Sequence, residues 1–178
     1  TGRAGSGKST VAQYLEDEWA FHTIGFADPI LEMIGALFAH CGIDGAWATE
    51  RSLKELPTAL GFSYRHLAQE LGTGWGRGLR DSFWLRVASL AVAPALERGD
   101  NIVISDVRYP NEAEWIVAQG GFVVRVLRAG RNADVRPHES EQYTDDIQAA
   151  AELLNHGSRA TLYDQVDRLM EQARRESA

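Results

Sequence analysis

The sequence contains a single cysteine, Cys41, and this scarcity excludes several kinds of site. One cysteine cannot form a disulfide within the chain, and it cannot supply a zinc site built from cysteine ligands. The apolar segment around Cys41 predicts that the thiol fills a hydrophobic core. This pattern suits a reducing compartment, so we expect a cytoplasmic protein.

Long hydrophobic runs are also missing, and no secretion signal is visible. No run approaches the roughly 18 apolar residues that a membrane span needs, so no membrane partner is expected. The net charge of −7 argues against stable nucleic-acid binding, which usually relies on a basic surface. At 178 residues the chain fits one domain with a substantial core.

Lysine is scarce as well, since only Lys8 and Lys54 occur against sixteen arginines. The planar guanidinium group suits bidentate contact with phosphate. A genome that favours arginine codons explains most of these positions equally well. Only arginines within motifs therefore support a functional interpretation.

The first ten residues read TGRAGSGKST, in which Gly2 to Ser9 match G-x-x-x-x-G-K-S. Glycines at 2, 5 and 7 let backbone N–H groups turn inward around an anion. Lys8 would approach the β- and γ-phosphates, and the Ser9 hydroxyl would bind Mg²⁺. The helix expected from Lys8 to Trp19 directs its positive end at the same anion. The pattern predicts a phosphate-binding loop.

Strand-like and helix-like segments alternate along the chain, which predicts an α/β fold with a parallel sheet. The expected strands are 20–26, 101–105, 122–127 and 151–154. The expected helices are 8–19, one capped by Asp28 that ends near Gly42, 82–98 with a bend at Pro94, 111–119 and 159–174. Residues 43–80 read as a helical insertion broken by glycines, and 129–144 as a polar loop or lid. A phosphate-binding loop needs a strand before it, so we expect a strand ahead of Thr1.

Two further segments carry charged groups that suit phosphate chemistry. Asp106 ends the apolar run 101–105, where a carboxylate can orient Mg²⁺, and Arg108 could reach a transferring phosphoryl group. A turn cap and a surface salt bridge are the structural alternatives for these two residues. Glu112 fits either a helix N-terminus or a substrate contact.

The segment Tyr64–Arg86 combines arginines with tryptophans among four glycines. Arg65, Arg77 and Arg80 offer guanidinium forks for a monophosphate, and Trp75 and Trp84 offer flat faces for a base. Ordinary core packing of both tryptophans is the alternative.

The blocks GRAGSGKST, FADP, RHLAQELGTGWGR, DSFW, SDVRYPNEAE, GGFVVRVLR, HESE and LLNHGS resemble bacteriophage-type deoxynucleoside monophosphate kinases in order and spacing. Leu31 departs from this pattern, which leads us to expect a lysine there. The resemblance implies transfer of the ATP γ-phosphoryl group to a deoxynucleoside 5′-monophosphate, giving a diphosphate and ADP. It also implies a homodimer, and the host cytoplasm if a phage encodes the chain.

The resemblance implies a single P-loop kinase domain over 1–178, a three-layer sandwich around a mainly parallel five-stranded sheet of order 2-3-1-4-5. The core would comprise 1–42, 81–128 and 145–178, with a substrate-binding insertion at 43–80 and a lid at 129–144. The four visible strands would be the second to fifth, and the first would lie outside the sequence.

The resemblance also implies roles for individual residues. The ATP contacts would be Gly2, Arg3, Ala4, Gly5, Ser6, Gly7, Lys8, Ser9, Thr10, Arg128, Asn155 and Gly157, with Asn155 hydrogen-bonded to the base edge. The Mg²⁺ ligands would be Ser9 and Asp106. The acceptor contacts would be Asp28, Arg65, Arg77, Trp84, Arg108 and Glu112. The groups acting on the transferring phosphoryl would be Lys8, Asp106, Arg108, Arg131 and Arg136.

Three other functions share parts of this pattern. A GTP-binding switch would need an N-K-x-D-type motif, and neither Lys8 nor Lys54 lies in one. A kinase of another small molecule, such as dephospho-coenzyme A, has a similar N-x-G loop but does not account for the arginine–tryptophan segment. A kinase acting on bases within DNA is disfavoured by the acidic composition.

Overall fold

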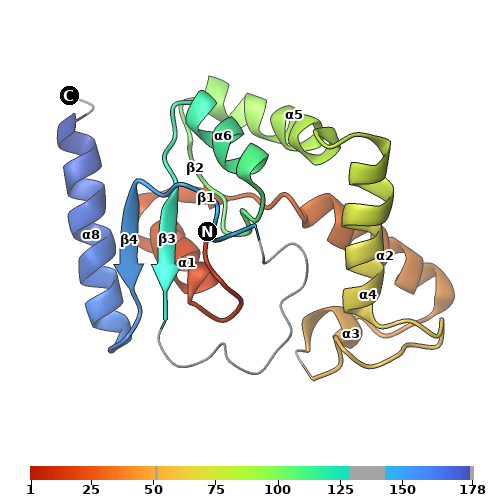
Figure 1. The fold of residues 1–178 in the computed structure, drawn as a ribbon. Coiled ribbons are helices and arrows are strands. Elements are labelled where there is room, and N and C mark those ends of the chain that lie inside the picture. Colours follow the sequence, from red (N-terminus) through yellow and green to blue (C-terminus); the bar gives the residue numbers. More distant parts are fainter. Residues whose placement is uncertain (51, 129–142, 177–178) are drawn as a thin grey trace. The chain divides into compact units, whose positions relative to one another are not determined.

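The computed structural model describes residues 1–50, 52–128 and 143–176 (Figure 1). The chain divides into two compact units, one formed by Thr1–Ile24 with Val92–Ala178 and the other by Gly25–Ala91. The second unit contains the whole segment 43–80 that the sequence presents as an insertion. Over the described ranges, no helix combines the length and the apolar character that crossing a membrane requires.

The first unit contains two pairs of parallel strands, which confirms the α/β class. β1 (Phe21–Thr23) pairs with β2 (Asn101–Val103), and β3 (Val124–Leu127) pairs with β4 (Ala151–Leu154). The described residues form two two-stranded sheets rather than one continuous sheet. β1 is shorter than the expected 20–26 because the Gly25 amide donates to the Asp28 carboxylate at 2.6 Å, which turns the chain.

Thr1 lies beside β3 and pairs with it as a residue of a neighbouring strand would. Its backbone nitrogen donates to the Val124 carbonyl at 2.7 Å, and the Val126 amide donates to the Thr1 carbonyl at 3.0 Å. This alternation is the hydrogen-bond pattern of a parallel strand. A cavity of about 360 Å³ lies beside Thr1, lined mainly by apolar residues that include Ile102 in β2, Ile104 just after β2 and Val123 just before β3.

Helices cover the strands of this unit and bury their apolar side chains between them. α1 (Lys8–Trp19) contributes Val11 and Leu15 to a core shared with β3, β4 and α8 (Arg159–Glu176). α8 lies beside β4 (Figure 1). Asp167 of α8 accepts hydrogen bonds at 2.9 Å from the Tyr14 hydroxyl and from Nε1 of Trp19, which fixes α8 against α1.

α6 (Pro110–Ala118) follows β2 and begins one residue earlier than the sequence indicates. α5 (Phe83–Glu97) begins in the second unit and ends in the first, and Gly99 takes the positive φ of 80° that stops a helix. The expected helices 82–98, 111–119 and 159–174 are therefore confirmed with small shifts at their ends.

The second unit is helical and is built on α2 (Asp28–Cys41), α3 (Ala46–Thr49) and α4 (Tyr64–Gln69). Its core contains Ile30, Ile34, Phe38, Tyr64 and Trp84. α2 begins one residue before its expected first position, so Ala27 is the N-cap and Asp28 lies in the first turn.

Two expectations for this unit are wrong. The glycines at 72, 74 and 76 do not break the helix, because α4 continues into the π-helix η1 (Glu70–Arg77). Cys41 is exposed rather than core-forming, since it is the last residue of α2, beyond the turn that buries Phe38.

Candidate phosphate-binding site

The segment Gly2–Gly7 forms a tight loop that only glycine allows at several positions. Gly2, Gly5 and Gly7 have φ angles of 131°, 74° and 113°. A Cβ at Gly2 would lie 2.5 Å from the Val126 carbonyl oxygen, and one at Gly7 would lie 2.5 Å from Nδ2 of Asn155. The loop is therefore packed against β3 on one side and against the segment after β4 on the other.

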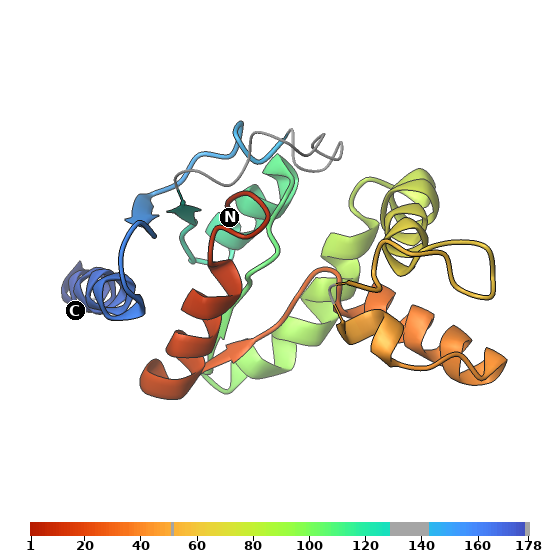
Figure 2. The same cartoon turned by 90° about the horizontal axis from the view of Figure 1, so that it is seen from below.

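Lys8 is the first residue of α1, and the loop before α1 starts at the N-terminus of the chain (Figure 2). Its Nζ donates to the carbonyls of Gly2 at 2.6 Å and Arg3 at 2.9 Å, so its charge lies over the loop. Ser9 and Thr10 occupy the first turn of α1, where backbone N–H groups lack helical partners. Loop, lysine and helix N-terminus together make an anion-binding arrangement.

The residues after β2 lie against the start of this loop. The Thr1 hydroxyl donates to the Val107 carbonyl at 3.0 Å, which brings the neighbouring Asp106 to the beginning of the loop. Lys8, Arg125 and Asp106 all lie close enough to the Thr1 nitrogen to act on it electrostatically. Lys8 and Asp106, distant in sequence, are therefore brought into one neighbourhood.

Asn155 holds the loop from the side of β4. Its Nδ2 donates to the Ser6 carbonyl at 2.8 Å, and its backbone amide donates to the Leu127 carbonyl at 2.7 Å. The side chain thus fixes the loop backbone, a role that the sequence pattern did not indicate. Gly157 lies in the same connection, and Ser158 then caps α8 by accepting from the Thr161 amide at 3.2 Å.

A second cavity of about 440 Å³ opens beside the loop and is rich in basic groups. Arg3, Arg125, Arg128 and His156 line it, and Asp145 is the acidic residue among the lining. Nη1 of Arg128 lies 3.5 Å from the Gly5 carbonyl, which places this guanidinium at the loop. Ala4, between these groups in the loop, is exposed. The cavity could receive an anionic ligand extending from the phosphate loop.

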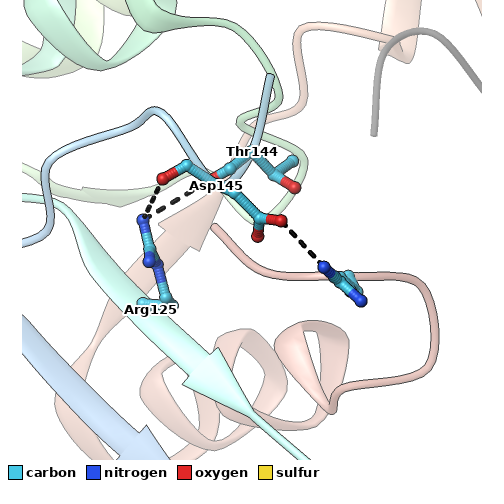
Figure 3. Close-up of polar contacts among 4 residues, drawn as sticks. Arg125, Thr144 and Asp145 are labelled. Atoms are coloured by element: carbon cyan, nitrogen blue, oxygen red, sulfur yellow. Dashed lines mark hydrogen bonds and ion pairs between the residues drawn. The ribbon is translucent and has the colours of Figure 1, made fainter. Parts of the chain in front are cut away.

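Arg125 fixes the chain segment that carries Asp145 (Figure 3). From β3, its Nη2 donates to the carbonyls of Thr144 at 3.3 Å, Asp145 at 3.5 Å and, more closely, Ile147. The Asp145 carboxylate in turn accepts from Nη2 of Arg3 at 2.8 Å. Sequence reasoning missed Arg125 and Asp145. The available clue was a lone arginine within the apolar strand sequence FVVRVL, which needs polar partners once it is partly buried.

Arg108 and Glu112 lie at the start of α6. The Glu112 carboxylate is buried and accepts hydrogen bonds from the backbone amides of Arg108 at 2.8 Å and Tyr109 at 3.1 Å. Glu112 was interpreted either as a helix N-terminal residue or as a substrate contact, and these hydrogen bonds are those of a residue that caps a helix N-terminus. It also fixes the backbone from which the Arg108 side chain extends.

The second unit contains the other predicted acceptor residues. Asp28 accepts from the Gly25 amide, Arg65 forms an ion pair with Glu55, and Nη1 of Arg77 donates to the Asp81 carbonyl at 3.3 Å. Trp84 is only 5% exposed and donates from Nε1 to the Gly72 carbonyl at 2.7 Å. Arg131 and Arg136 lie outside the described residues, so their roles stay predictions.

The charged groups at the loop are compatible with a magnesium–nucleotide complex. Mg²⁺ usually takes one or two protein oxygens and completes its coordination with phosphate oxygens and water. Ser9 and Asp106 supply that number of oxygens. Over the ranges that the structure describes, no group of three His, Cys, Asp or Glu side chains that could hold a metal ion occurs.

Comparison with known proteins gives the chain relatives in large DNA viruses. A protein of Acanthamoeba polyphaga mimivirus named "Putative deoxynucleotide monophosphate kinase" is 31% identical over 153 residues, 79% of this chain and 78% of that protein. Two proteins of Ictalurid herpesvirus 1 (strain Auburn) also match. Uncharacterized protein ORF77 is 34% identical over 51% of this chain and 41% of its own length, and uncharacterized protein ORF76 is 27% identical over 88% and 59%.

This chain therefore spans less than two thirds of either herpesvirus protein. No protein-family model matches it. The alignment with the mimivirus protein covers more than three quarters of both sequences, which is far more than the length of the phosphate-binding loop. The chain belongs to the same family as the mimivirus protein named "Putative deoxynucleotide monophosphate kinase".

Proposed function

We propose that the chain is an ATP-dependent deoxynucleoside monophosphate kinase that forms a deoxynucleoside diphosphate and ADP. The observation that carries this proposal is the loop Gly2–Lys8, whose positive-φ glycines and lysine sit at the N-terminus of α1. A nucleotide phosphate is the anion that such an arrangement suits. The name of the mimivirus relative supports the choice of a deoxynucleotide as acceptor.

The first unit would bind the phosphate donor. The loop amides and Lys8 would neutralise the β- and γ-phosphates, while Arg128 would approach the same anion from the other side of the loop. Mg²⁺ would be held by Ser9 and Asp106, and when bound it would supply positive charge to the phosphate oxygens. Asn155 would keep the loop in shape through its bond to the Ser6 carbonyl. Because phosphoryl transfer depends on alignment and charge, these contacts account for the donor half of catalysis.

The acceptor monophosphate would be bound by arginines, with Asp28 and Glu112 in supporting positions. Arg65, Arg77 or Arg108 is proposed to hold its phosphate. A guanidinium fork can hold two phosphate oxygens at once, which fixes the direction of the attacking oxygen. Arg131 and Arg136 are proposed to add charge at the transferring group, and segment 129–144 to exclude water.

We also propose that the two strand pairs are the outer parts of a five-stranded parallel sheet of order 2-3-1-4-5. The cavity lined by residues of β2 and β3 would receive the central strand, which Thr1 already continues through its bonds to Val124 and Val126. In that arrangement the carboxyl ends of the central strand and β2 would both meet the phosphate, as in other open α/β sheets.

The proposal extends to location and partners. It places the enzyme in the cytoplasm, as a homodimer without stable binding to nucleic acid. Two alternatives share the donor half of the mechanism, namely a kinase of dephospho-coenzyme A or a similar small molecule and a kinase of bases within DNA. The acceptor alone distinguishes these three activities.

The experiment is therefore an ADP-release assay with ATP and Mg²⁺ over a panel of acceptors. The panel contains the deoxynucleoside and nucleoside monophosphates, dephospho-coenzyme A and duplex DNA. The proposal expects ADP release to depend on a deoxynucleoside monophosphate. Release that follows dephospho-coenzyme A or DNA instead would replace the proposed function by the corresponding alternative.

A further inference from the structure

Residues 143–147, here called the strap, are packed onto the first unit. Thr144 and Ile147 are buried, with 3% and 2% of their surface exposed. The ring of Tyr143 lies against the ring of Tyr109 at the start of α6, with centroids 5.5 Å apart. The strap is therefore held at both of its ends, and it presents its remaining side chains from a defined position.

Arg125 of β3 holds the strap through its guanidinium group (Figure 3). Its Nη2 donates to the carbonyls of Thr144 at 3.3 Å and Asp145 at 3.5 Å, and also to that of Ile147. Lysine would keep the positive charge, but its shorter side chain ends before the position of Nη2 and lacks the planar fork. The attachment of the strap to β3 therefore depends on an arginine at this position.

The strap presents the Asp145 carboxylate to an arginine of the phosphate loop. Asp145 accepts from Nη2 of Arg3 at 2.8 Å. The Arg3 backbone is fixed in the loop, since its carbonyl accepts from Nζ of Lys8 at 2.9 Å. The side chains of Arg3 and Asp145 are more than half exposed, and both residues line the basic cavity beside the loop. The guanidinium of Arg3 can therefore exchange Asp145 for another anion while the loop keeps its shape.

We propose that the strap is an autoinhibitory contact, in which Asp145 competes with the nucleotide phosphates for Arg3, and that Arg125 is the positioning residue that keeps the strap in place. This inference rests on the proposed function for the identity of the anion and adds a control of nucleotide affinity to it. A guanidinium fork binds carboxylate and phosphate oxygens in the same way, so the two anions are alternative partners. A ligand that must first break a contact binds more weakly by the fraction of molecules in which the contact is intact. For an exposed ion pair this reduction is up to about fivefold.

The first test is a double-mutant cycle between Arg3 and Asp145, measured as the Kd for Mg²⁺–ATP by isothermal titration calorimetry. Asp145→Asn in the otherwise wild-type chain should lower the Kd by up to about fivefold. The same substitution in an Arg3→Gln chain should have little effect, because no guanidinium remains to be released. An equal gain in both chains would mean that Asp145 acts through its charge alone. That result, or weaker binding by Asp145→Asn, would overturn the inference.

The second test concerns the positioning residue. Arg125→Lys keeps the charge of the cavity and should release the strap, so it should lower the Kd in the same direction as Asp145→Asn. Adding Asp145→Asn to Arg125→Lys should bring no further gain, since both act on the same contact. Arg168→Lys is the matched control, because Arg168 is an exposed arginine of α8 and should leave the Kd unchanged.

A higher Kd in Arg125→Lys with an unchanged Tm would assign Arg125 to the nucleotide itself and overturn its role as a positioning residue. If Arg125→Lys does not fold, the cycle between the exposed side chains of Arg3 and Asp145 still decides whether the strap is autoinhibitory. A wild-type chain that does not bind Mg²⁺–ATP would overturn the proposed function, and this inference with it.

Discussion

The ion pair between Arg3 and Asp145 places a carboxylate beside the proposed phosphate site, and removing it should strengthen nucleotide binding. Asp145→Asn keeps the size of the side chain and removes its charge. Arg3 then loses this carboxylate partner, 2.8 Å away, and its guanidinium can turn toward a triphosphate. The local potential at the loop also becomes more positive. Both changes favour an anionic ligand.

The expected magnitude is modest because both side chains are more than half exposed, at 53% and 60%. Unit charges about 4 Å apart interact by about 1 kcal/mol in water, and exposed pairs contribute about 0.2–1 kcal/mol. At about 1.4 kcal/mol per tenfold, Asp145→Asn should lower the Kd for ATP by up to about fivefold. Isothermal titration calorimetry with the Mg²⁺–ATP complex measures this change directly.

Asp146→Asn provides a matched control for net charge. Asp146 is the next residue and is also exposed, and among the described residues its carboxylate makes no ion pair. The Asp146→Asn substitution should change the Kd for ATP less than Asp145→Asn does. Raising the salt from about 0.05 M to about 1 M should remove most of the difference, since the screening length falls to about 3 Å. Weaker binding by Asp145→Asn, or an equal effect of both variants, would refute this reasoning.

Three other expectations concern the loop and its supports. Lys8→Ala and Arg108→Ala should each nearly abolish transfer while leaving Tm close to wild type, and wild-type turnover of either variant would remove that residue from the mechanism. Gly7→Ala should lower Tm and ATP affinity through about 1–3 kcal/mol of strain and collision with Asn155. Gly5→Ala, which also has positive φ but no neighbour within 4 Å, should lose less, and equal losses would contradict the role of Asn155. The hydrogen bond to Asp167 raises the pKa of Tyr14 from 10.0 to about 12. The contribution of this hydrogen bond to the stability of the fold is therefore complete below pH 10 and is lost as the pH rises toward 12. Tyr14→Phe should therefore show a smaller loss of Tm over that interval, as followed by circular dichroism.

The sequence predicted the features that depend on local pattern. The helices from Lys8, after Asp81 and from Arg159 were expected from apolar spacing and glycine stops, and they are found with ends shifted by up to two residues. The glycines of the phosphate loop adopt the positive φ angles that the motif requires. Such features depend on neighbours in sequence, so a single sequence is enough to indicate them.

Features that depend on contacts between distant segments were not predictable. In the π-helix η1, Trp84 packs on Gly76 and donates to the Gly72 carbonyl, whereas both glycines look like helix breakers in the sequence. Asn155 reaches the Ser6 carbonyl across 149 positions, and Arg3 reaches Asp145 across 142. A sequence shows the residue types at these positions but not which partner each one meets.

The measurement that most directly tests the proposed function follows the γ-phosphoryl group itself. The chain is incubated with γ-³²P-labelled ATP, Mg²⁺ and the preferred deoxynucleoside monophosphate, and the products are separated by chromatography. We expect the label in the deoxynucleoside diphosphate, with none transferred by Lys8→Ala. Label that appears only as inorganic phosphate, or that stays in ATP, would contradict a phosphotransferase acting on deoxynucleotides.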